Sequence, residues 1–153
     1  MFFLYQALIC ILLILSPLII SFRIFKKKED PKRFMEKFCF PSKNKFIGNL
    51  IWFHGSSVGE LLSILPLVQE LEKNKSINQI LITTSTLSSA QIFKKFNFKK
   101  TVHQFFPIDS VFFSYKFLNY WKPTIAIFVE SEIWPSIFKI LNKKKIPLKL
   151  LNA

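Results

Sequence analysis

Acidic residues are scarce in this chain. Its 153 residues include nine Asp and Glu against 22 Lys and Arg, which gives a net charge of +13. A chain this basic attracts phosphate groups, whether they belong to nucleic acid, anionic lipid or a phosphorylated substrate. Half of the residues are hydrophobic, which excludes a disordered chain. Because carboxylates are so few, each one that follows an apolar strand is a candidate for a functional role.

Glycine and cysteine are rarer still. The three glycines are Gly48, Gly55 and Gly59, so the chain has neither the G-x-G-x-x-G of dinucleotide-binding folds nor the Gly-Lys-Ser/Thr of a P-loop. The two cysteines, Cys10 and Cys39, have no metal-ligand spacing and make no disulfide framework. We therefore expect no metal and no cofactor.

Charged side chains are missing from Met1 to Phe22. A helix of this length spans roughly 33 Å, enough to cross the hydrocarbon core of a bilayer. Nothing basic precedes the apolar run and no small-residue cleavage site follows it, which argues against a cleaved signal peptide. Residues 1–22 are therefore expected to form an uncleaved single-pass anchor, although Pro17 leaves a kinked or partly inserted helix open.

The basic residues begin directly after this apolar run. Residues 23–50 carry nine Lys and Arg against three Asp and Glu, and by the positive-inside rule they face the cytoplasm. We interpret residues 23–48 as a juxtamembrane segment attracted to an anionic membrane surface. Phe34, Met35 and Phe38 would lay one side of a short helix on the bilayer, and a solvated basic linker is the alternative. Nucleic acid is not an expected partner, since no RNP-like motif accompanies the aromatic residues.

From residue 49 on, short apolar runs alternate with helix-length segments. This alternation predicts an α/β fold, a Rossmann-like parallel sheet with helices on both faces. The expected strands are Leu50–Phe53, Gln79–Thr83, Thr101–Phe105, Thr124–Val129 and Pro147–Leu151. The expected helices are Glu60–Lys73, Ser88–Phe96, Ser110–Tyr120 and Pro135–Lys144.

Ligands of such folds bind beyond the carboxyl ends of the strands. Glu60, the Thr83–Thr86 cluster, Asp109 and Glu130 follow four of the expected strands. Helix capping is the simpler interpretation of the Thr83–Thr86 cluster, and of Asp109 before the helix from Ser110. Glu130 follows a run that should be buried, so we expect its carboxyl to be partly desolvated and its pKa raised.

The turn between the first strand and its helix fits two chemistries. Gly55-x-Ser57-x-Gly59 matches the nucleophile elbow of a serine hydrolase, with Ser57 as nucleophile. The same turn places Glu60 at a helix N-terminus, where it is either a general base or a helix-start carboxylate favoured by the dipole. A hydrolase triad in this fold runs Ser, acid, His, whereas here His103 precedes Asp109 and no His follows. The serine hydrolase therefore remains only a remote alternative.

Several motifs occur together in one order along the chain. They are Trp52-Phe53-His54, Ser57-Val58-Gly59-Glu60, Thr83-Thr84-Ser85-Thr86, Pro107-Ile108-Asp109, Glu130-Ser131-Glu132-Ile133-Trp134-Pro135, Ile146-Pro147 and Asn152-Ala153. Together they resemble the N-terminal half of the 3-deoxy-D-manno-octulosonic acid (Kdo) transferases. The resemblance implies a glycosyltransferase of B-type fold, whose N-terminal domain takes the lipid A precursor and whose C-terminal domain holds CMP-Kdo. It also implies a place on the cytoplasmic face of the bacterial inner membrane, in lipopolysaccharide biosynthesis.

The resemblance also implies roles for individual residues. Glu60 corresponds to the proton acceptor, and Glu130 to a residue that stabilises the transition state. Ser56, Ser57 and Gly59 are candidates for binding the acceptor, because a helix N-terminus and its turn suit a phosphate.

The same resemblance leads us to expect a truncated Rossmann-like acceptor-side domain at residues 49–153, without the C-terminal donor domain. Such a chain would be inactive alone, or completed by a separate chain that carries the donor domain. A non-catalytic membrane-anchored module of the same fold is the other interpretation.

Overall fold

The computed structural model describes residues 2–130 and 133–151. Five parallel strands form one sheet in the order β3-β2-β1-β4-β5. The strands are β1 (Leu50–His54), β2 (Gln79–Thr84), β3 (Thr101–Phe105), β4 (Ile125–Val129) and β5 (Leu148–Leu151). All five expected strands are confirmed, with ends that differ by at most one residue.

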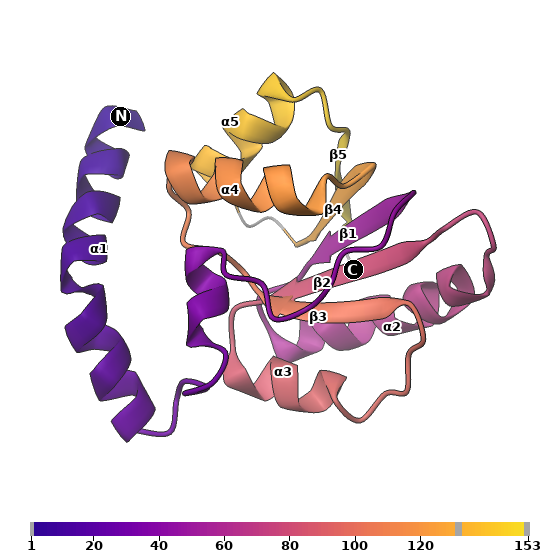
Figure 1. Cartoon of the computed structure of the whole chain (residues 1–153), viewed down its shortest axis with the longest axis horizontal. Helices are drawn as coiled ribbons and strands as arrows, with labels where there is room; N and C mark the ends of the chain where they lie inside the picture. The colour runs from indigo at the N-terminus through magenta and orange to yellow at the C-terminus, as the bar shows by residue number, and fades with distance from the viewer. Residues whose placement is uncertain (1, 131–132, 152–153) are drawn as a thin grey trace.

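Helices cover both faces of the sheet, as predicted (Figure 1). They are α2 (Val58–Lys73), α3 (Leu87–Phe93), α4 (Val111–Trp121) and α5 (Pro135–Lys143). The side chains of β1 alternate between the two cores, as the pleat of a strand requires. Trp52 packs under α4 and α5 with Phe117 and Ile137, whereas Phe53 packs under α2 with Leu61 and Ile64.

The N-terminal helix α1 (Phe2–Phe25) is, among the described residues, the one helix long and apolar enough to cross a membrane. It runs beside the sheet domain (Figure 1). A short 3-10 helix, η1 (Phe34–Phe38), connects it to the domain.

The expected short helix at Phe34–Phe38 forms, and it packs on the domain, whereas a solvated basic linker would not. Glu36 is buried and makes an ion pair with Arg33, with 2.8 Å between Arg33 Nε and Glu36 Oε1. Phe38 packs edge-on against Phe113 of α4. For this short helix the solvated-linker alternative is therefore wrong, and so is the expectation that Phe38 lies on the bilayer, because charged and aromatic side chains of the helix are packed on the domain. Met35 remains exposed.

Candidate functional site at the carboxyl edge of the sheet

The strand order reverses direction between β1 and β4. From β1 the chain passes through α2 to β2 on one side, whereas β4 lies on the other side of β1 and leads to α5. Such a switch point opens a crevice beyond the carboxyl ends of the two strands. In the register His54 pairs with Phe128, and two residues further along their strands come Ser56 and Glu130. The two acidic motifs therefore leave the sheet side by side.

Glu60 is held firmly at the start of α2. Its Oε2 accepts a hydrogen bond from the Ser56 backbone N–H at 2.8 Å, and its Oε1 accepts one from the Ser57 hydroxyl at 2.6 Å. The Ser57 Oγ in turn accepts the Glu60 N–H at 3.2 Å. This is a variant of the capping box, so the helix-start interpretation of Glu60 holds. The bonds also fix the carboxylate in one orientation, which a general base requires.

The two glycines of the turn have different tasks. A Cβ on Gly55 would lie 3.1 Å from the Glu60 Cβ, so Gly55 makes room for the folded-back carboxylate. A Cβ on Gly59 would meet nothing closer than the Ser57 Oγ at 4.0 Å. Gly59 therefore leaves open space on the outer side of the helix start.

His54 lies buried directly beneath this turn. The sequence places it in the Trp52-Phe53-His54 motif but indicates no role for it. Its Nδ1 lies 3.1 Å from the Thr83 carbonyl oxygen and 3.0 Å from the Thr83 Oγ1. Its Nε2 lies 3.4 Å from the Ser56 Oγ, and its ring packs in a tilted arrangement on Phe106, with 3.9 Å between the ring centres. The ring also meets Trp134 edge-on, at 5.8 Å. His54 thus connects the Glu60 turn with the segment that follows Glu130.

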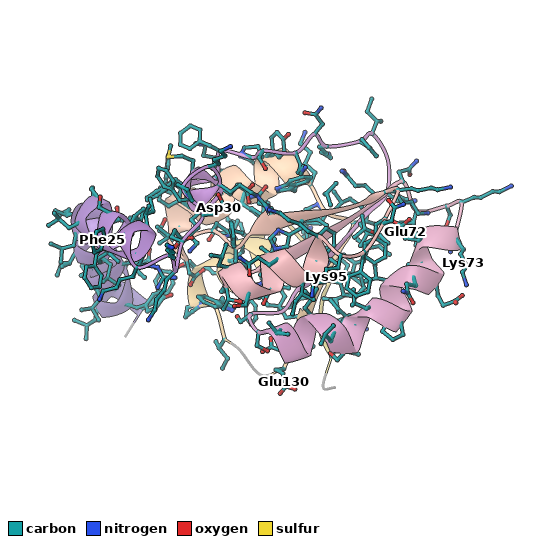
Figure 2. The ribbon with its side chains drawn as sticks, turned by 90° about the horizontal axis from the view of Figure 1, so that it is seen from below. Phe25, Asp30, Glu72, Lys73, Lys95 and Glu130 are labelled. Carbon is teal, nitrogen blue, oxygen red and sulfur yellow. The ribbon has the colours of Figure 1, made fainter. Side chains whose placement is uncertain are left out.

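Glu130 is more exposed to solvent than the sequence predicts. Its side chain is exposed (Figure 2), so the expected partial desolvation is wrong. Burial of the strand ends at its last residue, Val129, and Glu130 lies in the turn that follows. Its backbone has φ 63°, the left-handed region that costs a non-glycine residue about 1 kcal/mol or more. Such strain is often found at functional sites. Ser131 and Glu132 of the same motif lie outside the described residues.

Asp109 caps a different helix from the expected one. Its buried carboxylate accepts the backbone N–H groups of Ser136 and Ile137 at the start of α5, at 3.0 and 2.9 Å. Helix α4 is capped by Ser110 instead. The reason is that α5 begins at Trp134-Pro135, which offers no capping side chain of its own. The capping role of the Thr83–Thr86 cluster is confirmed for Thr86, which caps α3.

His103 belongs to a separate buried cluster. Arg33 Nη2 lies 2.9 Å from His103 Nδ1, and His103 Nε2 lies 2.8 Å from Thr84 Oγ1. Burial and the Arg33 guanidinium lower the pKa of His103 to about 3. The Ser57 hydroxyl is bound to Glu60 rather than to a histidine. These contacts do not support the triad that a serine hydrolase needs.

Metal ligation is not indicated by the described side chains. Within residues 2–130 and 133–151 no three His, Cys, Asp or Glu residues gather as a possible metal site. The site therefore offers carboxylates, hydroxyls and helix-start N–H groups for chemistry.

Comparison with known proteins gives one consistent result. A family model described as 3-deoxy-D-manno-octulosonic-acid transferase (kdotransferase) matches residues 32–153. A probable mitochondrial 3-deoxy-D-manno-octulosonic acid transferase of Arabidopsis thaliana is 38% identical over 141 residues, which cover 90% of this chain and 32% of that protein. A 3-deoxy-D-manno-octulosonic acid transferase of Rickettsia bellii is 39% identical over 150 residues, covering 98% of this chain and 36% of that protein. One of Haemophilus influenzae is 30% identical over 94% of this chain and 34% of its own length. The chain thus spans about a third of the length of these relatives.

Proposed function

Since the chain belongs to the 3-deoxy-D-manno-octulosonic-acid (Kdo) transferase family, we propose that it forms the acceptor side of a glycosyltransferase that moves Kdo from CMP-Kdo to a lipid A precursor. The observation that carries this proposal is the oriented carboxylate of Glu60 at the switch point between β1 and β4. Residues 32–153 of this chain, which the family model matches, include this edge of the sheet and both acidic motifs.

Glu60 acts as the proton acceptor. A sugar hydroxyl is a poor nucleophile and needs a base within hydrogen-bond reach as it attacks. A carboxylate has about four lone-pair sites, and the two bonds from Ser56 and Ser57 use one on each oxygen. The remaining sites are available to take the proton from a glucosamine hydroxyl while its oxygen bonds to the Kdo anomeric carbon. CMP then leaves with the electron pair of the broken bond.

Glu130 stabilises the positive charge that develops on the Kdo ring. Glycosyl transfer generally passes through an oxocarbenium-like transition state, which a nearby carboxylate favours. The exposed side chain of Glu130 and its left-handed backbone support this role, because they aim the carboxylate outward from the strand end.

The acceptor binds at Ser56, Ser57 and the start of α2. The Ser57 hydroxyl is already bound on both sides by Glu60. Ser57 therefore contacts the acceptor through its backbone rather than its side chain. The open space over Gly59 lets a phosphate approach the first N–H groups of α2, where the helix dipole favours an anion.

The donor is bound elsewhere. CMP-Kdo is proposed to bind in the part of the relatives that this chain does not match, supplied by a further stretch of polypeptide. No cofactor or metal is needed for this reaction. The anionic surface of the bacterial inner membrane, on its cytoplasmic side, is the proposed location, with α1 as the membrane-associated element.

The test uses the 153-residue chain alone and fused to the unmatched portion of the Rickettsia bellii relative. We expect the chain alone to bind lipid A precursor without transferring Kdo, and the fusion to transfer it. In the fusion, Glu60→Gln should abolish transfer and leave acceptor binding unchanged. Glu70→Gln is the matched control, because Glu70 lies exposed on the same helix and pairs only with Lys73 among the described contacts.

Three outcomes would contradict parts of this proposal. Transfer by the 153-residue chain alone would show that the donor site lies within it. Turnover retained in Glu60→Gln would remove Glu60 from the base role. A fusion that binds membranes but never transfers Kdo would favour the non-catalytic membrane module.

A further inference from the structure

Helix α1 has one half-buried face that runs along its whole length. Its half-buried positions recur every three or four residues, which is the period of one helix face. They are Phe2, Gln6, Ile9, Leu13, Ser16, Ile20 and Ile24. We call these residues, with Tyr5 and Arg23 beside them, the inner face. A helix that only led into the domain would be covered at its last turn alone, so α1 lies lengthwise against the protein (Figure 1).

Polar side chains fasten the N-terminal half of the inner face to the domain. The Tyr5 hydroxyl donates to Asp109 Oδ2 at 2.7 Å. The Gln6 Nε2 donates to Ser136 Oγ at 2.7 Å, and its Oε1 accepts the Val111 N–H at 3.3 Å. These bonds reach the starts of α4 and α5 and the loop before α4. Two adjacent residues of a very apolar helix are thus used to hold it on the domain.

The opposite side of α1, which we call the outer face, is apolar throughout. Its members are Leu4, Leu8, Ile11, Leu15, Leu18 and Phe22, and all are exposed. Figure 2 views the helix nearly end-on, with Phe25 labelled. Exposed Met35, Phe40 and Phe112 do not belong to this face, since they line a groove on the inner side of α1 together with Pro17 and Ile20. An apolar surface of this extent marks a partner or a membrane.

Basic side chains lie near both ends of α1. Lys26, Lys27 and Lys28 are exposed directly after α1. At the other end the exposed Lys139 lies against the inner face, with its Nζ 4.1 Å from the centre of the Phe2 ring. Positive charge at both ends of an apolar helix matches the anionic headgroups of a single membrane surface.

We propose that α1 lies in the plane of the membrane, with its outer face in the lipid of an anionic bilayer and its inner face docked on the sheet domain. A docked helix that crossed the bilayer would carry Asp109, Lys139 and the starts of α4 and α5 into the hydrocarbon core. Because Tyr5 is bonded to the loop that follows β3, the in-plane helix holds the carboxyl edge of the sheet at the membrane surface. This inference concerns how α1 docks and does not depend on Kdo transfer.

The depth of α1 in the bilayer tests the proposal. Single cysteines would replace Leu4, Ile11, Leu18 and Phe25, four exposed positions spaced seven residues apart along one side of the helix. The background is Cys10→Ser, and Cys39 is buried. Nitroxide labels would be measured by power-saturation EPR on the whole chain in vesicles of phosphatidylcholine and phosphatidylglycerol.

An in-plane helix places all four labels at one depth, about 5–10 Å below the headgroups. A crossing helix would shift the depth by roughly 10 Å from each site to the next, with Ile11 and Leu18 near the bilayer centre. The second pattern would overturn the proposal. Mutual spin broadening with poor access of oxygen would overturn it too, because it would show a second copy of the chain on the outer face.

A separate pair of variants tests whether Tyr5 and Gln6 hold α1 on the domain. Tyr5→Phe combined with Gln6→Leu should release α1 and move the Ile11 and Leu18 labels toward the bilayer centre. Ser21→Ala removes an exposed hydroxyl that bonds only to the Pro17 carbonyl among the described contacts, and it should leave the depths unchanged. A flat profile that survives the double substitution would show that Tyr5 and Gln6 do not hold the helix.

Discussion

Glu60 carries out a structural and a chemical task with the same two oxygens. The bonds from Ser56 and Ser57 close the start of α2, and the same bonds present the carboxylate in a fixed direction. A base that also caps its own helix needs no separate side chain to orient it. The scarcity of acidic residues in the chain is consistent with this double use.

The two glycines of the turn allow a direct test of this packing. Gly55→Ala should lower the free energy of unfolding by about 1–2 kcal/mol, because the new methyl presses on Glu60. Gly59→Ala should raise it by roughly 0.5 kcal/mol, because open space receives the methyl and alanine favours the helix. Urea unfolding followed by circular dichroism measures both variants. Equal effects of the same sign would show that the close approach at Gly55 is unimportant.

Residue-level prediction was correct for local geometry, whereas the catalytic role of Glu60 stays a prediction. The position of Glu60 at a helix start could be identified because a strand, a small-residue turn and a helix adjoin in the sequence. The buried contacts of His54 could not, because its partners Thr83 and Trp134 come from distant parts of the chain. The exposure of Glu130 was missed for a related reason, since nothing in the sequence states where helices stop covering a strand.

At the scale of elements, α5 depends on a neighbour for its start. Helices α2, α3 and α4 each begin with a serine or threonine cap of their own, whereas α5 is capped by Asp109 from the loop after β3. The stability of α5 is therefore tied to the position of that loop. The hydrogen bond from Tyr5 makes α1 part of the same junction.

Removal of this shared cap should be costly. Asp109→Ala leaves the N–H groups of Ser136 and Ile137 buried without their acceptor, and we expect a loss of about 3 kcal/mol. Ser110→Ala, which removes the local cap of α4, should cost only about 1 kcal/mol. Chemical denaturation of the two variants gives the comparison. Similar losses would argue that Asp109 is an ordinary cap.

The elements themselves were predictable from short-range patterns. The apolar runs predicted the ends of all five strands and of the intervening helices to within a few residues. The largest difference between a predicted and an observed end is in α3, which ends at Phe93 instead of Phe96. The packing of η1 was not predictable. It depends on Glu36 reaching the Phe105 N–H at 2.8 Å on the far strand β3, and a basic segment gives no sign of one buried carboxylate.

Across the whole molecule, the cluster around Glu36 joins the segment that follows α1 to the edge of the sheet. Arg33 bonds Glu36 and the His103 carbonyl, and the Ser42 hydroxyl also donates to Glu36. Arg33 only donates, so His103 Nδ1 accepts and its proton lies on Nε2, toward Thr84. The neutral imidazole of His103 therefore takes part in the contact between this segment and the edge of the sheet.

Acid should therefore weaken the fold through His103. The folded chain keeps His103 neutral down to pH about 3, whereas the unfolded chain takes up a proton near pH 6.5. Between these values the unfolded state binds more protons, so this residue removes about 1.4 kcal/mol of stability per pH unit as the pH falls.

The measurement compares the native chain with His103→Gln, which cannot titrate and can still reach Thr84. At pH 7 the native chain should be more stable, and the difference should shrink from pH 6 to pH 4. Urea midpoints at each pH provide the values. A constant difference would contradict the depressed pKa.

The strand order also determines when each strand meets its neighbours while the chain is synthesised. The central strand β1 acquires its first neighbour when β2 emerges, but its second neighbour, β4, begins about 75 residues after β1 does. At roughly 5–20 residues per second, ribosomes take on the order of 4–15 s to make that stretch. During this interval one edge of the strand that carries Trp52 and Phe53 lacks its partner. The central strand of the finished sheet is thus the one that waits longest for its second neighbour while the chain is being made.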